Sequence, residues 1–119
     1  MSDTPVDLQI EQVGNVTVIS IRNPRVAVEM SDRFEEEVVC AVDTLAAPRV
    51  LIDFDGVEFI SSAILGKLIK LNGRVVTDRQ GRLVLCCLAE RIADVFKITG
   101  LEQLFTICKT RDEALASLE

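Results

Sequence analysis

The amino-acid sequence predicts a single α/β domain: a mixed, mostly parallel sheet with helices packed against it. Three observations support this fold class: a hairpin signal near the start, short apolar runs typical of buried strands, and helical periods between those runs. The predicted order of elements is ββαβαβαβα across residues 1–119, with no internal linker or repeat to divide the chain. A length of 119 residues suits one hydrophobic core.

The opening hairpin is predicted from alternation. Apolar and polar residues alternate over 8–13 and, less cleanly, over 16–21. Gly14 and Asn15 between the two segments both tolerate positive φ, which is typical of a tight hairpin turn. Pro24 closes the second strand. Because only this pair is predicted to be antiparallel, the hairpin should form one edge of the sheet.

A helix is expected after the hairpin. Ser31 or Asp32 should cap it, because Asp32 and Glu35 have the spacing of a capping box. Pro48 ends it. Its apolar face has helical spacing and comprises Phe34, Val38, Ala41, Val42 and Leu45.

Three further strands follow from apolar density. Residues 50–54 and 82–88 are the short apolar runs expected of parallel strands covered on both faces. The chain turns after 50–54 and continues extended over 57–60. A last brief strand is expected at 104–107.

Three further helices complete the domain. The first begins at Ser62 and is stopped by Gly81, and the second, marked by the apolar residues of 92–96, is closed by Gly100. The third begins after Thr110, which has a capping-box spacing to Glu113.

Charge argues against nucleic-acid binding. Nineteen acidic and thirteen basic residues give a formal charge of −6, whereas phosphate-backbone binding needs clustered Lys and Arg. Lys67, Lys70 and Arg74 share one helical segment, and we interpret them as a solvated face. A protein partner with a positive surface suits this charge better. The chain has no apolar run near the roughly 18 residues of a membrane span and no secretory signal, so we expect a cytoplasmic protein.

The four cysteines have none of the spacings of a metal or redox motif. Cys86 and Cys87 are adjacent in a predicted strand, so their side chains should point to opposite faces. We interpret these two residues, with Cys40 and Cys108, as reduced small hydrophobes, and expect neither a metal site nor a cofactor.

The stretch VEFISSAILGKL, residues 57–68, carries the candidate site. Ser61 is placed to cap the helix, which leaves the Ser62 hydroxyl free to face solvent. A serine nucleophile needs a neighbouring base, and the chain contains no histidine. Neither a G-x-S-x-G elbow nor a glycine-rich phosphate loop is present. We therefore expect no catalytic residue, and an enzyme acting at this junction is the weakest alternative.

An accessible serine at a helix start suits phosphorylation instead. A phosphate adds about two negative charges. The helix dipole and free backbone N–H groups would tolerate this dianion, whereas a partner docked over the junction would have to bury it. Phosphorylation of Ser62 could thus switch binding while the fold stays intact.

These residues resemble the STAS domain family of bacterial anti-sigma factor antagonists. Residues 59–66 match its central motif, 51–59 its preceding strand, and 95–107 its last strand-helix-strand unit. The resemblance implies a non-enzymatic switch protein that binds an anti-sigma factor with serine-kinase activity and a histidine-kinase-like ATPase fold. This partner would phosphorylate Ser62, and a phosphatase would reset it.

The expected partner interface surrounds Ser62. It comprises Asp55, Glu58, Ser61, Ala63, Ile64 and Lys67. The sequence departs from the family pattern at three of these positions: Ser61 replaces an acidic residue, Ala63 a Ser or Thr, and Ile64 a glycine. Ile64 is expected to add apolar surface for the partner. The alternative is a STAS scaffold in another signalling complex, which binds its partner without a phosphorylation switch.

Overall fold

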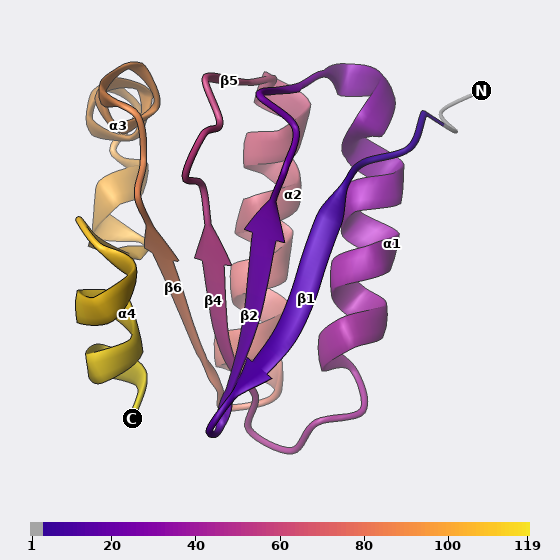
Figure 1. Ribbon diagram of the computed structural model, residues 1–119, viewed down its shortest axis with the longest axis vertical. Coiled ribbons are helices and arrows are strands. Elements are labelled where there is room, and N and C mark those ends of the chain that lie inside the picture. Colours follow the sequence, from indigo (N-terminus) through magenta and orange to yellow (C-terminus); the bar gives the residue numbers. More distant parts are fainter. Residues whose placement is uncertain (1–3) are drawn as a thin grey trace.

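The computed structural model describes residues 4–119 as a sheet with helices on both faces (Figure 1). In chain order the elements are β1 (Leu8–Val13), β2 (Val16–Ile21), β3 (Arg25–Val26), the 3₁₀ turn η1 (Val28–Met30), α1 (Ser31–Val42), β4 (Arg49–Asp53), β5 (Phe59–Ile60), α2 (Ser62–Asn72), the π-helical segment η2 (Gly73–Asp78), β6 (Arg82–Cys86), α3 (Glu90–Ile98), the 3₁₀ turn η3 (Leu101–Gln103), β7 (Thr106–Cys108) and α4 (Arg111–Leu118).

The main sheet has the strand order β1-β2-β4-β6-β7. The β1–β2 hairpin is antiparallel, with Leu8 opposite Ile21, and Gly14 supplies the positive φ of its turn. Every other pairing in this sheet is parallel. The predicted mixed, mostly parallel sheet with an antiparallel edge is confirmed.

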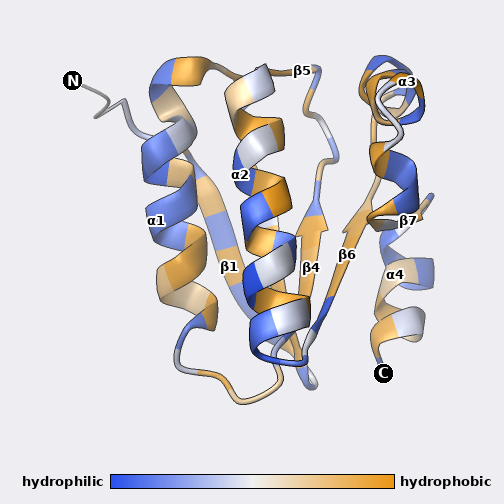
Figure 2. Cartoon of the chain, turned by 180° about the vertical axis from the view of Figure 1, so that it is seen from behind, coloured by the Kyte–Doolittle hydropathy of each residue, from blue (hydrophilic) through white to orange (hydrophobic). Residues whose placement is uncertain are grey.

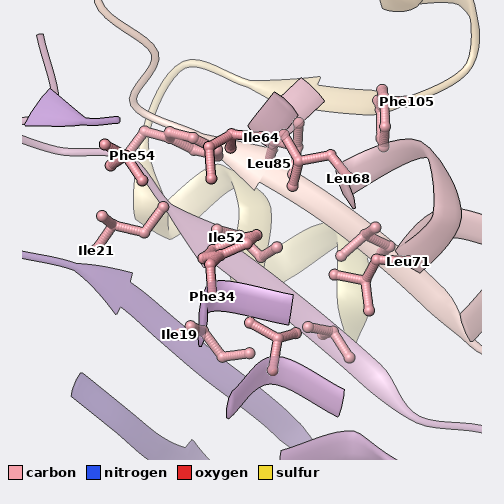
Figure 3. Packing of buried hydrophobic residues seen from close by; sticks show 14 of the residues in the cluster. Ile19, Ile21, Phe34, Ile52, Phe54, Ile64, Leu68, Leu71, Leu85 and Phe105 are labelled. Carbon is pink, nitrogen blue, oxygen red and sulfur yellow. The ribbon is translucent and has the colours of Figure 1, made fainter. Parts of the chain in front are cut away.

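The larger core lies between one face of the sheet and helices α1 and α2. Figure 2 shows these helices in front of the sheet, alternating between hydrophilic and hydrophobic residues, while β4 and β6 are mostly hydrophobic. In Figure 3, Phe34 of α1 and Leu68 of α2 lie with strand residues such as Ile52, and all three are fully buried. Burying each such side chain contributes about 1.5–3 kcal/mol.

A smaller core lies under α4 on the opposite face, where Ala114 and Leu118 pack on Leu51 and Val84. Both faces of β4 and β6 are therefore covered, which explains why these strands have continuous apolar runs. Near α3, Phe96 and Phe105 are buried with their ring centroids 5.7 Å apart, edge to face.

The predicted capping box of the first helix is wrong. Met30 occupies the N-cap position of α1 and makes no side-chain cap bond, because turn η1 runs directly into the helix. The Ser31 hydroxyl instead donates to the carbonyl of Val28 at 2.8 Å. Asp32 and Glu35 pair with lysines of α2, as described below. The helix also ends at Val42, ahead of Pro48.

Other boundaries differ from the sequence prediction for local reasons. Strand β7 begins two residues after the predicted start, because 101–103 form turn η3. Strand β6 ends at Cys86, since Cys87 has a φ of 63°. The sequence prediction also missed strand β3, which is only two residues long.

The predicted helix from Ser62 to Gly81 is interrupted in its last part. Helix α2 ends at Asn72 and continues as the wider π-helical turns of η2. Gly81 then meets the chain before β4 so closely that an added Cβ would lie 2.2 Å from the carbonyl oxygen of Pro48. Glycine is the residue that permits this approach.

Candidate functional site

The start of α2 is held by a small second sheet. Strands β3 and β5 pair in parallel, with Arg25 opposite Phe59. The backbone N–H of Ser61 then donates to the carbonyl of Val26 at 3.0 Å, and that of Glu58 donates to Pro24 at 2.7 Å. These bonds fix the residues directly before α2, and β5 leads into the start of that helix (Figure 1).

Ser61 caps α2, as its position predicts. Its backbone is extended, with φ −76° and ψ 163°, and its hydroxyl oxygen accepts the N–H of Ile64 at 3.4 Å. The hydroxyl thereby satisfies one of the N–H groups that every helix start leaves without an intrahelical partner.

Ser62 is the first residue of α2 and is exposed. Within residues 4–119 its hydroxyl makes no hydrogen bond, and the backbone N–H groups of Ser62 and Ala63 have no acceptor. A free hydroxyl therefore stands beside two free donors at the positive end of a helix dipole. Such a helix start is suited to hold an anion.

The expectation that Ile64 adds apolar surface is wrong. Ile64 is fully buried, together with Leu68 and Leu71 on the same face of α2. The helix places residues four apart on one side, so Ile64 continues the stripe that faces the sheet. Ala63 is half-buried.

Lys67 is tied to helix α1. Its ammonium lies 2.8 Å from a carboxylate oxygen of Glu35 and 3.2 Å from one of Asp32, and its side chain is 19% exposed. Lys70 pairs with the other oxygen of Glu35 at 3.1 Å. The hydrogen bond from Lys67 is the main cause that lowers the pKa of Glu35.

The basic residues of this helical segment are therefore not simply a solvated face. Arg74, on η2, likewise forms a two-pronged pair with Asp43, with distances of 2.9 and 2.8 Å. The ion pairs of Lys67 and Lys70 join α2 to α1, and the pair of Arg74 joins η2 to Asp43, the residue that follows α1. The sequence prediction missed this role because the acidic partners, Glu35 and Asp43, lie more than 30 residues away from Lys67 and Arg74 along the chain.

Asp55 and Glu58 are exposed on the segment between β4 and β5. Gly56, with a φ of 85°, forms the turn between them. The N–H of Asp55 donates to the carboxylate of Asp53 at 2.9 Å. Asp53 itself is 6% exposed and is directed toward α4, where Arg111 lies 3.5 Å away.

Sequence reasoning missed exposed apolar residues at the same end of the molecule. Phe59 is 40% exposed, with the guanidinium carbon of Arg25 4.5 Å from its ring centroid. Helix α3 lies against β5 and exposes Val95 at 39% and Ile98 at 84%. No helical period could single these out, because Val95 and Ile98 have the same spacing as core residues.

Ser62 lines none of the larger grooves found among residues 4–119. The groove between α1 and η2, of about 360 Å³, is lined by residues such as Glu35, Lys67 and Thr77 but not by Ser62. The nearest acidic residues in sequence, Asp55 and Glu58, form no hydrogen bond with the Ser62 hydroxyl within residues 4–119. The geometry is that of an open helix start on the surface.

The molecule thus combines a mixed sheet of the order β1-β2-β4-β6-β7 with an exposed serine at the first residue of α2. A model of the STAS domain family matches residues 7–114. The chain belongs to the STAS domain family. In addition, no helix within residues 4–119 has both the length and the apolar content to span a bilayer.

Individual relatives agree with this assignment. BtrV of Bordetella bronchiseptica, named as an anti-sigma factor antagonist, is 32% identical over 89 residues, which cover 75% of each chain. A STAS domain protein of Planctomyces limnophilus has a TM-score of 0.86 at 25% identity, covering 98% of this chain and all of that one. The phosphorylated form of SpoIIAA from Bacillus superposes with a TM-score of 0.66 at 20% identity, covering 95% of this chain and all of that one.

Proposed function

We propose that this protein is an anti-sigma factor antagonist whose binding to an anti-sigma factor is switched off by phosphorylation of Ser62. The single observation that carries the proposal is the exposed Ser62 hydroxyl, without a hydrogen-bond partner in the described chain, at the first position of α2. The partner is an anti-sigma factor with serine-kinase activity and a histidine-kinase-like ATPase fold. It transfers the γ-phosphoryl group of ATP to Ser62, and a phosphatase removes it.

The free N–H groups of Ser62 and Ala63 support tolerance of the phosphate by the fold. A phosphoserine at a helix start gains charge-assisted hydrogen bonds and a favourable interaction with the helix dipole. Ser61 keeps its own cap bond to Ile64, so the helix start does not depend on the Ser62 hydroxyl. The modified domain therefore stays folded.

Binding responds differently to the same phosphate. A partner docked over the start of α2 has to remove water from about two negative charges, and a buried, unpaired charge costs several kcal/mol. Exposed Phe59 and Ile98 offer apolar anchors for such a partner at this end of the domain. The net charge of −6 favours a partner with a positive surface. Phosphorylation of Ser62 makes the domain more negative, so it increases the repulsion between the domain and any acidic surface of the partner.

Of the expected interface residues, Ser61, Asp55 and Glu58 remain in the proposal as surface neighbours. Ala63 contributes mainly its backbone N–H. Lys67 reaches a partner only by leaving its ion pairs with Asp32 and Glu35, and the buried side chain of Ile64 is excluded from the interface.

The test is affinity capture from host lysate with four versions of the protein. Wild type and Ser62→Ala should retain the anti-sigma factor, whereas Ser62→Glu should lose it. Ala116→Glu is the matched control, because it adds the same charge at an exposed site on α4, across the sheet. Mass spectrometry of the protein from its host should find phosphate on Ser62. Retention of the partner by Ser62→Glu at the wild-type level would contradict the switch.

A second candidate is a STAS scaffold in another signalling complex, without a switch. The serine at position 61 favours it, because here a neutral cap replaces the acidic residue of the family pattern. In that case Ser62→Glu and wild type should capture the same partner equally. Both candidates are non-enzymatic, and we propose that the protein acts in the cytoplasm.

A further inference from the structure

We propose that Cys86, Cys87 and Asp53 form a binding site for one thiophilic divalent cation of the zinc class, separate from the start of α2. The two cysteine sulfurs and a carboxylate oxygen of Asp53 all lie within 4.8 Å of one another. The residues come from the carboxyl ends of β4 and β6, which are neighbours in register: Asp53 is opposite Cys86.

The backbone at Cys87 creates this cluster. In an extended strand the two adjacent side chains would point to opposite faces. Strand β6 ends at Cys86, however, and Cys87 has a φ of 63°, in the left-handed region that non-glycine residues rarely adopt. The Cys87 sulfur thereby lies 3.5 Å from the Cys86 sulfur. The expectation of opposite faces is wrong.

The sulfur separation fits a shared metal ion. Two thiolates bound tetrahedrally at a metal–sulfur distance of about 2.3 Å lie roughly 3.8 Å apart, close to the 3.5 Å found here. Asp53 adds a harder oxygen ligand. Its two oxygens have one protein partner each, Asp55 N–H at 2.9 Å and Arg111 at 3.5 Å, which leaves lone pairs free on both. Water completes the coordination.

The charge balance is favourable despite the burial. Cys86 is fully buried and Cys87 half-buried, so the charge of a bound cation has to be balanced by its own ligands. On binding, each thiol releases its proton to water as its sulfur–metal bond forms. One divalent cation replaces two protons, and the net charge of the site is unchanged. Arg111 stays paired with Glu11, so it need not move toward the cation.

Cys87 provides the route of entry, because it is the only partly exposed member of the cluster. The ion would also restrain the end of β4, and the Asp55-Gly56 turn toward β5 begins two residues later. Sequence spacing could not reveal this site. Its ligands come from two strands more than 30 residues apart, and its two cysteines converge only through one left-handed residue.

The test titrates the reduced full-length chain with Cd²⁺ and follows ultraviolet thiolate-to-cadmium charge-transfer absorption, with calorimetry for stoichiometry. Wild type should bind one ion at this site and show a raised Tm, and Zn²⁺ should compete. Cys87→Ser should lower the affinity at least about tenfold and abolish the Tm increase, and Asp53→Asn should lower the affinity by about tenfold. Cys87 is chosen because it is half-buried, so its replacement spares the core.

Cys40→Ser is the matched control, since Cys40 is an exposed free thiol outside the cluster. It should leave the affinity and the Tm increase unchanged. The proposal is overturned if wild type shows no charge-transfer band, if Cys87→Ser binds Cd²⁺ as tightly as wild type, or if binding disappears in Cys40→Ser.

Discussion

Replacing Gly81 with alanine tests how closely the segment before β4 approaches the segment before β6. The new Cβ would lie 2.2 Å from the Pro48 carbonyl oxygen and 2.9 Å from the Pro48 nitrogen. Both are backbone atoms and cannot rotate away. The two segments would have to separate by about 0.8 Å to reach 3.0 Å, a separation below which Cβ contacts are essentially never found.

That separation acts on a specific hydrogen bond. The N–H of Arg82 donates to the same Pro48 carbonyl at 2.8 Å, and a comparable stretch takes it out of bonding range. Loss of the bond costs about 0.5–1.5 kcal/mol and overpacking about 1–3 kcal/mol. Alanine has less conformational entropy than glycine in the unfolded chain, and this difference stabilises the folded state by about 0.4–1 kcal/mol. We expect Gly81→Ala to lower the free energy of unfolding by about 0.5–4 kcal/mol, or Tm by roughly 2–16 °C.

Urea denaturation and thermal scans measure both quantities. Gly73→Ala is the matched control, because Gly73 is helical with a φ of −60° and an added Cβ meets nothing within 4 Å. It should raise the stability by about 0.4–1 kcal/mol. Equal stability of Gly81→Ala and wild type, or a greater loss in Gly73→Ala, would refute the reasoning.

Three further predictions concern α2, each checked by urea denaturation. Ser61→Ala should cost about 0.5–1 kcal/mol through loss of the cap, whereas Ser62→Ala should change stability by less than half as much, and equal losses would deny their separate roles. Ile64→Ala should cost about 2–5 kcal/mol because the side chain is fully buried, and a loss under 1 kcal/mol would place it at the surface. Lys67→Met should make the free energy of unfolding fall less steeply as the pH is lowered into the acid range. The lowered pKa of Glu35 gives wild type stability that is present above about pH 4.5 and lost as pH falls through the folded pKa, so an unchanged acid slope would contradict the pairing.

The periodicities of the sequence predicted the element types and their order well. Apolar runs identified β4 and β6, alternation with Gly14 identified the hairpin, and Thr110 was placed correctly as the cap of α4, where its hydroxyl accepts the Glu113 N–H at 3.1 Å. These signals depend on backbone preferences and burial patterns within a few residues, which the local sequence contains.

The same local rules gave the right cap at Ser61 and the wrong one at Asp32. At Ser61 the β3–β5 ladder fixes the extended residue that a cap requires. At Asp32 and Glu35, the carboxylates pair with Lys67 on another helix, and turn η1 has already started the helical backbone. The two predicted caps therefore had different outcomes, because tertiary partners competed for the carboxylates at one of them.

The sequence by itself determined the class of fold and the position of the exposed serine, because both follow from hydrophobic pattern and from helix-start chemistry. Only the tertiary structure decided which neighbours surround that serine. In the folded structure Ile64 lies in the core, Lys67 forms an ion pair with Glu35 of α1, and Cys86 and Cys87 lie together beside Asp53. The physical reason is that side-chain direction and pairing depend on packing between distant segments, whose separation in space is not encoded by their separation in sequence.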